Sequence, residues 1–247
     1  MIRIRGLKKR LGSKQVLDGV DLEIRTGESV VVMGRSGTGK SVLLKHVIGL
    51  MAPDEGSIEV DGQEIVGIKE TELNQVRKRF GMLFQGAALF DSLTVGENVG
   101  LALREHLRLP EDRIRARVAE RLSWVGLSGV EDMKPASLSG GMRKRVGLAR
   151  AIAMDPQFIL YDEPTTGLDP IMADVIDQLI RSLQRKLGVT TVVVTHDMVS
   201  AYKLADRLAM LHDGQMVFVG TPEETRGTPN PLVRQFVEGS SQGPIAV

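Results

Sequence analysis

The sequence contains no cysteine, only one tryptophan, two tyrosines and six phenylalanines among 247 residues, and a formal net charge of only +1. Without cysteine, the chain cannot use disulfides, thiolate metal sites or cysteine nucleophiles. Its absence also suits a reducing compartment. A net charge near zero gives no strong electrostatic attraction to nucleic acid or to anionic lipid.

Long apolar runs are also missing. The longest, at 30–33 and 192–194, have the length of buried strands and fall well short of the roughly 18 residues that a spanning helix needs. The basic segment Met1–Arg10 lacks the apolar core of a signal peptide. We therefore expect one large globular domain, or a core with a small insert, that acts at a membrane only through a partner.

The first third of the chain alternates β-rich runs with glycine turns, and Asp61-Gly62 is a hairpin signal between two such runs. From about residue 90 to 154 the pattern becomes helical, with Ile114, Val118, Leu122 and Val125 on one face. Trp124 is expected in core packing. Predicted strands here are 2–5, 16–24, 29–33, 57–60 and 80–84, and predicted helices are 41–50, 95–107, 111–125 and 139–153.

After residue 154, strand-like and helix-like segments alternate, which favours a parallel sheet with helices on its faces. The predicted strands are 157–161 and 189–195, the helices are 170–187 and 198–205, and a last hairpin (207–211 and 215–219) turns at Asp213-Gly214. The tail from Thr221 is rich in proline and small polar residues. We expect it to be irregular, or ordered only against a neighbouring molecule.

A phosphate-binding loop follows the apolar strand at 29–33. The pattern G-x-x-x-x-G-K-[ST] is complete in Gly34, Arg35, Ser36, Gly37, Thr38, Gly39, Lys40 and Ser41. Its glycines let successive backbone N–H groups face phosphate oxygens, and the helix that follows adds its positive end. Lys40 is expected at the β- and γ-phosphates and the Ser41 hydroxyl on Mg²⁺.

A second apolar strand, 158–161, ends in two acidic residues. Such a position lies at the carboxyl edge of an open α/β sheet, where ligands bind. Taken alone, Asp-Glu after a strand is more often a helix start or a loop. With a phosphate loop upstream, we expect Asp162 to hold Mg²⁺ through water and Glu163 to act as general base on the attacking water.

The segment Leu138-Ser139-Gly140-Gly141-Met142 opens another helix. Ser139 is a good N-cap, and the glycines leave N–H groups open to a phosphate. On its own the segment would be a plain capped helix. In a chain that already has a phosphate loop, this second helix end can serve the γ-phosphate held by a neighbouring subunit.

With these residues the chain resembles the ABC ATPases over nearly its whole length, and the order of the other motifs matches. The resemblance implies a head-to-tail dimer that holds two ATP molecules, each between one subunit's phosphate loop and the other's signature helix. It implies that Gln85 contacts Mg²⁺ and the attacking water, that Gly167-Leu168-Asp169 crosses the dimer interface, and that His196 contacts the γ-phosphate. Asp169, before Pro170, is also a good N-cap.

Two positions depart from the family pattern. Met142 replaces the glutamine that usually ends the signature, and Leu11 stands where an aromatic residue usually stacks on adenine. Apolar contact with the base is kept there, but aromatic stacking is lost. The cationic residues Arg143, Lys144, Arg145 and Arg150 are interpreted as a solvated helix face or a subunit contact, because no aromatic residues interleave as they do in nucleic-acid sites.

Some segments resemble a narrower group, the ATPase subunits of Mla/Mce-type lipid transporters. These are 85–99, the methionine-ended signature, and 231–239 with 243–245. In that family the first segment receives the coupling helix of a membrane permease, and the tail packs on the adjacent ATPase subunit. The resemblance therefore implies a permease and an Mce-domain lipid-binding protein as partners.

The resemblance implies an α/β fold: a P-loop NTPase core with a parallel sheet, an antiparallel β subdomain and an inserted helical subdomain. The expected domains are the ATP-binding core with its β subdomain (1–88 and 155–220), the helical signature subdomain (89–154) and a C-terminal extension (221–247). ATP and Mg²⁺ are the expected cofactors.

The expected function is ATP hydrolysis that powers a permease by closing and opening an ATPase dimer, most simply a homodimer. The expected cargo is phospholipid or another lipid that moves between membranes of the cell envelope. The chain itself is expected to lie peripherally at the cytoplasmic face of the inner membrane. The alternatives are an ABC ATPase with another import or export cargo, a non-transport ABC ATPase, a regulatory module that does not hydrolyse, and a P-loop kinase. No direct contact with nucleic acid is expected.

Overall fold

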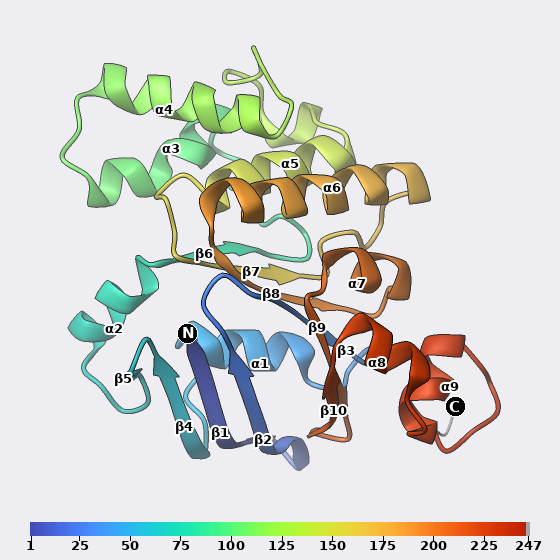
Figure 1. Cartoon of the computed structure of the whole chain (residues 1–247). Coiled ribbons are helices and arrows are strands. Elements are labelled where there is room, and N and C mark those ends of the chain that lie inside the picture. The colour runs from blue at the N-terminus through green and yellow to red at the C-terminus, as the bar shows by residue number, and fades with distance from the viewer. Residues whose placement is uncertain (246–247) are drawn as a thin grey trace. The chain divides into compact units, whose positions relative to one another are not determined.

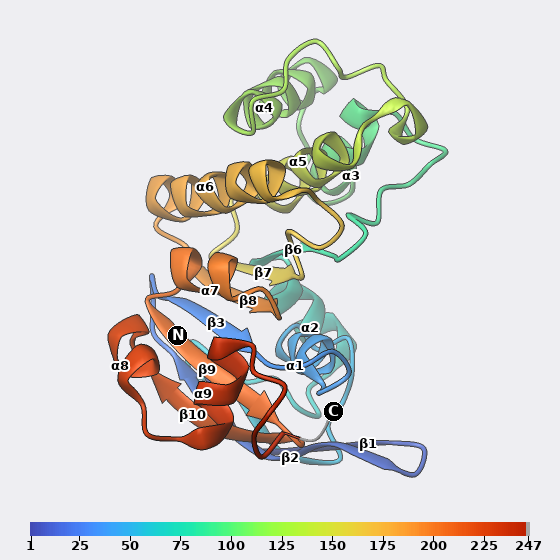
Figure 2. The same ribbon diagram turned by 90° about the vertical axis from the view of Figure 1, so that its right-hand side faces the viewer.

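A computed structural model describes residues 1–245, shown in Figures 1 and 2. The chain forms two compact units, one made of Met1–Leu73 with the chain from Val192 onward and the other of Asn74–Thr191. The domain boundaries expected from the sequence stay a prediction, and their last two residues lie outside the described part.

The first unit contains an antiparallel sheet in the order β2-β1-β4-β5. Alternate side chains of β1, such as Ile2 and Ile4, are buried, as expected for a sheet with one face on the core. The Asp61-Gly62 hairpin is confirmed between β4 and β5. The strands are β1 (Ile2–Leu11), β2 (Lys14–Ile24), β4 (Glu55–Val60) and β5 (Gln63–Glu64).

The first unit also contains a run of strands in the order β10-β9-β3-β8. The five residues of β3 are all buried, and β3 pairs in parallel with β9, with Val32 opposite Ala209. The strands are β3 (Ser29–Met33), β8 (Thr190–Thr195, which begins at the end of the second unit), β9 (Arg207–His212) and β10 (Gln215–Gly220). The predicted parallel pairing and the hairpin at Asp213-Gly214 are confirmed.

Short helices complete the first unit. Helix α1 (Lys40–Val47) follows the phosphate loop and α7 (Met198–Leu204) packs on β3. The prediction of an irregular tail is wrong for α8 (Pro222–Gly227) and α9 (Pro231–Glu238), of which α8 contacts β9, β10 and α9 (Figure 2). Two of the tail's prolines, Pro222 and Pro231, misled this prediction because each stands at the first position of a helix, where its missing N–H costs nothing.

The second unit combines a parallel strand pair with helices. Strands β6 (Phe80–Leu83) and β7 (Phe158–Asp162) run in parallel, and the rings of Phe80 and Phe158 stack with their centroids 4.8 Å apart. The helices α3 (Val95–His106), α4 (Glu111–Trp124) and α5 (Gly140–Ala151) pack against one another, and α5 also contacts β6 and α6 (Pro170–Leu187) (Figure 1). A 3₁₀ turn, η1 (Pro135–Ser137), precedes α5.

The sequence predicted these helices with small errors at their ends, and the four apolar residues of α4 and its C-cap are buried as expected. Trp124 is only half-buried: its ring lies between the cations of Arg121 and Lys186, at 3.9 and 3.5 Å from the ring centre. The short helix α2 (Glu70–Arg77) was not predicted. This helix is strongly polar, and its buried apolar residues are Leu73 and Val76. It therefore lacks the apolar stripe by which a helix is predicted from sequence.

Candidate nucleotide site

The phosphate loop leaves β3 at Met33 and enters α1 at Lys40. Gly34 has a φ of 156°, and a Cβ on it would collide with the carbonyl oxygen of Leu211. Gly39 is left-handed, and a Cβ there would lie 2.9 Å from the Val16 carbonyl oxygen. Both positions therefore require glycine, which keeps the loop tight around the end of α1.

Side chains of the loop donate hydrogen bonds to carbonyl oxygens of the same loop. The ammonium of Lys40, only 4% exposed, donates to the carbonyl oxygens of Gly34 at 2.7 Å and Arg35 at 2.9 Å. The Thr38 hydroxyl donates to the Arg35 carbonyl at 2.9 Å. Helix α1 has no side-chain hydrogen bond at its N-cap. A helix N-terminus of this kind suits an anion.

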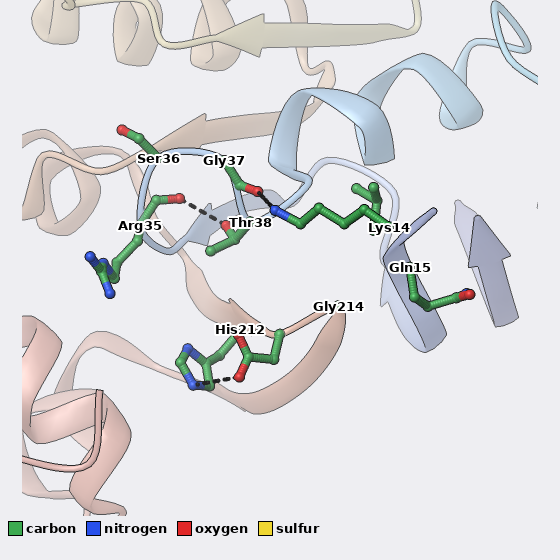
Figure 3. A pocket seen from close by; sticks show the side chains of 10 residues that line it. Lys14, Gln15, Arg35, Ser36, Gly37, Thr38, His212 and Gly214 are labelled. Atoms are coloured by element: carbon green, nitrogen blue, oxygen red, sulfur yellow. Dashed lines mark hydrogen bonds and ion pairs between the residues drawn. The ribbon is translucent and has the colours of Figure 1, made fainter. Parts of the chain in front are cut away.

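A cavity of about 380 Å³ adjoins the loop (Figure 3). Lys14 reaches across one side to the Gly37 carbonyl oxygen at 3.4 Å, and His212 faces Asp213 with 3.4 Å between Nε2 and Oδ2. Its wall is formed by the start of β2, the outer part of the phosphate loop and the β9–β10 turn. Leu11 lies at the end of β1 and is 42% exposed.

His196 also belongs to the first unit. It follows β8, the neighbour of β3, and its side chain is exposed. The next residue, Asp197, caps α7 by accepting from the Val199 N–H at 2.8 Å, and the Thr195 hydroxyl accepts from the Asp197 N–H at 3.0 Å. The turn that carries His196 is therefore fixed on both sides.

The pairing of β6 with β7 brings Gln85 and Glu163 to the same edge of the sheet. Leu83 lies opposite Tyr161 in parallel register, and each of the two polar residues comes two positions later. Asp162 ends β7 and is 7% exposed, and Glu163 is 8% exposed. The prediction that an apolar strand delivers these carboxylates to a sheet edge is confirmed.

Glu163 is held by two neighbours within the second unit. Its Oε2 accepts from the Thr166 hydroxyl at 2.7 Å, and its backbone carbonyl accepts from the Lys144 ammonium at 3.2 Å. Burial lowers the pKa of Lys144, while the charges of Glu163 and Asp162 act in the opposite direction. The carboxylate is thus oriented by a hydroxyl and lies in the field of a buried cation.

The signature segment begins α5 as predicted. The Ser139 hydroxyl accepts from the Met142 N–H at 3.2 Å, and Ser139 is exposed. A Cβ on Gly141 would lie 2.5 Å from the Met172 Cε, so a side chain there would have to displace the flexible end of Met172. Asp169 caps α6 by accepting from the N–H groups of Ile171 and Met172, both at 3.0 Å, which confirms its predicted capping role.

The predicted site residues therefore fall into two groups. The first unit holds residues 34–41 and His196, and the second holds Gln85, Ser139, Gly140, Gly141, Asp162, Glu163 and Asp169. Among residues 1–245 no cluster of three or more His, Asp or Glu could hold a metal ion unaided. The expected Mg²⁺ donors, Ser41, Gln85 and Asp162, are all oxygen donors, which fits a metal that keeps waters and substrate oxygens as its other ligands.

The sequence patterns did not indicate three residues that lie near the predicted site residues. The interpretation of the α5 cations as a solvated face is wrong for Lys144, which is 6% exposed, and for Arg150, which donates to the carbonyl oxygens of Ala87 and Ala88. Thr166 was not singled out. A signal existed for Lys144, because it shares a helix face with the buried residues Gly141, Leu148 and Ala151.

Comparison with known proteins identifies the family. The model for ABC transporters matches residues 17–166. The probable ribonucleotide transport ATP-binding protein mkl of Mycobacterium leprae is 44% identical over 100% of this chain and 71% of its own length. The intermembrane phospholipid transport system ATP-binding protein MlaF of Escherichia coli K12 is 40% identical over 99% of this chain and 91% of its own.

A plant relative and a solved structure are also similar to this chain over most of its length. The chloroplastic protein TRIGALACTOSYLDIACYLGLYCEROL 3 of Arabidopsis thaliana is 44% identical over 99% of this chain and 75% of its own length. The ATP-binding cassette MJ0796, solved as a dimer bound to ADP and Pi, superposes with a TM-score of 0.83 at 35% identity over 90% of this chain and 98% of that one.

The likeness confirms the expected ABC ATPase fold and its reaction. Among residues 1–245 no helix has the length and apolarity to cross a bilayer. The protein belongs to the ABC transporter family as an ATP-binding subunit, an ATPase whose hydrolysis of ATP is coupled to transport.

Proposed function

We propose that two copies of this chain close around two ATP molecules and drive a permease that moves phospholipid between membranes of the cell envelope. Each ATP lies between the phosphate loop of one copy and the Ser139-Gly140-Gly141 segment of the other. The chain sits at the cytoplasmic face of the inner membrane, and an Mce-domain lipid-binding protein completes the complex. The dimeric, ADP- and Pi-bound form of MJ0796 supports the pairing.

The proposed chemistry assigns a role to each site residue. Lys40 and the N–H groups of residues 34–39 bind the phosphates, and the signature segment and Asp169 complete the site from the partner copy. Glu163 takes a proton from the attacking water, while Gln85 and His196 position that water against the γ-phosphate. Transfer needs no covalent intermediate, so the protein contributes positioning and charge stabilisation.

Mg²⁺, held by Ser41, Gln85 and Asp162, would neutralise charge on the β- and γ-phosphate oxygens when bound. The cavity beside the phosphate loop supports a place for the ribose and base, with Val16 and His212 among its walls. Because Leu11 replaces the usual aromatic residue, the base is expected to make apolar contact there without ring stacking.

The observation that carries the catalytic assignment is the β6–β7 register, which puts Gln85 and Glu163 at one edge with Thr166 on the carboxylate. The lipid cargo is supported by the full-length similarity to MlaF, named for phospholipid transport. The similarity to mkl, which also spans this whole chain and is named for probable ribonucleotide transport, keeps another cargo as the alternative.

The test is to purify tagged Glu163→Gln protein from gently solubilised host membranes with ATP and Mg²⁺ and to identify what co-purifies. A Lys40→Ala sample, treated identically, controls for contacts that do not depend on nucleotide. A permease with an Mce-domain protein and bound phospholipid is the expected result. A permease with a different substrate-binding protein would overturn the lipid cargo, and a soluble or nucleic-acid partner alone would overturn the whole proposal.

A further inference from the structure

Three residues near the proposed catalytic centre have an unusual backbone conformation. Of the six non-glycine residues with positive φ among residues 1–245, three are aspartates, which tolerate the left-handed region. The other three are Ala87 (62°), Ala88 (46°) and Glu163 (49°). Alanine and glutamate adopt this region reluctantly, because Cβ crowds the following carbonyl oxygen. Such residues persist only where their surroundings hold them.

In all three cases a cation of the signature helix α5 donates to the carbonyl oxygen of the left-handed residue. Arg150 donates to the Ala88 carbonyl oxygen through Nη1 at 2.7 Å and to that of Ala87 through Nη2 at 2.6 Å. Lys144 donates to the Glu163 carbonyl oxygen at 3.2 Å and also to that of Gln85. Hydrogen bonds from ionised donors are stronger than those from neutral donors, so these contacts are suited to holding a strained backbone.

We propose that Lys144 and Arg150 are positioning residues for ATP hydrolysis, which hold Glu163 and the loop that follows Gln85 in their strained conformations and tie both to the signature helix. This inference rests on the proposed roles of Glu163 and Gln85. Neither cation is assigned a contact with nucleotide; each acts through the backbone of a catalytic segment.

A purely structural role explains the arrangement less well. Burying an ammonium costs desolvation, and a well-packed apolar side chain usually stabilises a core as much or more. Lys144 is 6% exposed, yet both of its hydrogen-bond acceptors are carbonyl oxygens of proposed catalytic residues. By contrast Arg145, on the same helix, donates to the Gly126 carbonyl oxygen at 3.2 Å, away from either segment.

The arrangement also connects three motifs within one unit. Because Ser139 caps α5, a shift of the signature helix on meeting a partner's nucleotide would move Lys144 and Arg150 with it. The backbone of Glu163 and of residues 85–88 would follow. The two cations therefore give a physical route by which the signature helix, the catalytic carboxylate and the loop after Gln85 change together.

The test measures ATP hydrolysis by the whole complex, purified through a tag on this chain, together with nucleotide affinity. Lys144→Met should lower kcat by about 10- to 100-fold, since small misplacements of catalytic groups have effects of that size. KM and the Kd for ATP should stay within about threefold, and Lys144→Arg should restore most of the rate. The matched control Arg145→Gln, which removes another partly buried cation from α5, should keep the wild-type rate.

A second pair of variants isolates backbone strain. Arg150→Gln should also lower kcat. Adding Ala87→Gly and Ala88→Gly, which remove the penalty for the left-handed conformation, should recover a large part of the loss. No recovery in the triple variant, with thermal unfolding unchanged, would overturn the role of Arg150 in holding strain.

The outcomes separate this inference from the proposed function. If Glu163→Gln abolishes turnover but Lys144→Met and Arg150→Gln keep the wild-type kcat, the positioning role is wrong and the proposed function stands. If Glu163→Gln itself keeps the wild-type rate, the proposed function fails first. Should Lys144→Met not fold, Lys144→Gln, whose amide is a shorter and uncharged donor group, is measured instead, and its kcat should also fall.

Discussion

At the scale of single residues, Lys40 should control nucleotide affinity. Its ammonium is buried and bonded to the carbonyl oxygens of its own loop, so it is already placed where the phosphates are expected. Lys40→Ala should weaken ATP binding by about tenfold or more, because a charge-assisted contact is lost. Isothermal titration measures this, with the exposed Lys45→Ala on the same helix as control. Equal affinity of both variants for ATP would contradict the role of Lys40.

Glu163 should control turnover and leave binding intact. Glu163→Gln keeps an oxygen that can accept from the Thr166 hydroxyl, so the side chain should stay in place without its basicity. We expect hydrolysis to slow by about 10²-fold or more, the size seen when a catalytic group is lost. A phosphate-release assay on the purified complex checks this, with the exposed Glu105→Gln as control. Turnover at the wild-type rate in Glu163→Gln would contradict the assignment of Glu163 as the general base.

Sequence reasoning found these residues because their motifs are local. Residues 34–41 need their glycines and lysine at fixed spacing, and Asp162 with Glu163 ends an apolar run, so neighbours in the chain carry the information. The contacts of Lys144 and Arg150 are different, since they reach backbone carbonyls far away in the sequence. Nothing in a run such as Ala87-Ala88 signals a left-handed backbone, because alanine has no preference for it.

At the scale of elements, α1 should make stability depend on pH through His46. This side chain is 1% exposed, and Nδ1 lies 2.7 Å from the Val42 carbonyl oxygen. Burial lowers the pKa of His46 below its ordinary value of about 6.5. Below that pH the unfolded chain takes up a proton that the folded chain resists, so the free energy of unfolding falls as pH falls.

His46→Asn, which can still donate to the Val42 carbonyl oxygen, should therefore lose less stability on acidification than the wild type. Urea unfolding at about pH 7.5 and about pH 5.5 gives the difference. The matched control is His106→Asn, which removes an exposed histidine. An identical loss of stability in the wild type and His46→Asn would contradict the assigned role of His46.

The segment after Gln85 should carry the permease contact. Asn98 is fully buried and its amide bonds to the backbone of Phe90, Leu93 and Thr94, which fixes the segment while Phe90 stays 52% exposed. Phe90→Ser should reduce co-purification of the permease several-fold, because an exposed aromatic side chain is a frequent anchor at interfaces. Leu50→Ser, also 52% exposed, is the matched control. Equal recovery of permease in both would contradict this placement.

Elements were predictable where a continuous apolar run or a periodic apolar pattern was strong. The buried strand β3 and the 18-residue helix α6 followed from the sequence, the latter with its first and last residues correct. Helices α8 and α9 were missed because they are short and begin with proline, and α2 because it is polar. Short helices depend on tertiary packing for their stability, which a local pattern does not record.

At the scale of the whole molecule, activity should depend on two incomplete half-sites becoming complete when two copies meet. The chain carries a phosphate loop in one unit and a signature helix in the other, and each presents backbone N–H groups suited to an anion. The proposed pairing gives one γ-phosphate two such helix ends, one from each copy. The family resemblance supplied this pairing, whereas the residues alone left a plain capped helix as an alternative.

The most direct test is the molar mass of purified Glu163→Gln protein, measured by light scattering on a sizing column with and without ATP and Mg²⁺. A shared site predicts a dimer with ATP that separates when nucleotide is removed. Ser139→Arg in the same background, at an exposed position, should bind ATP yet remain monomeric. A mass that does not respond to ATP, or a Ser139→Arg variant that dimerises as fully, would contradict the shared site.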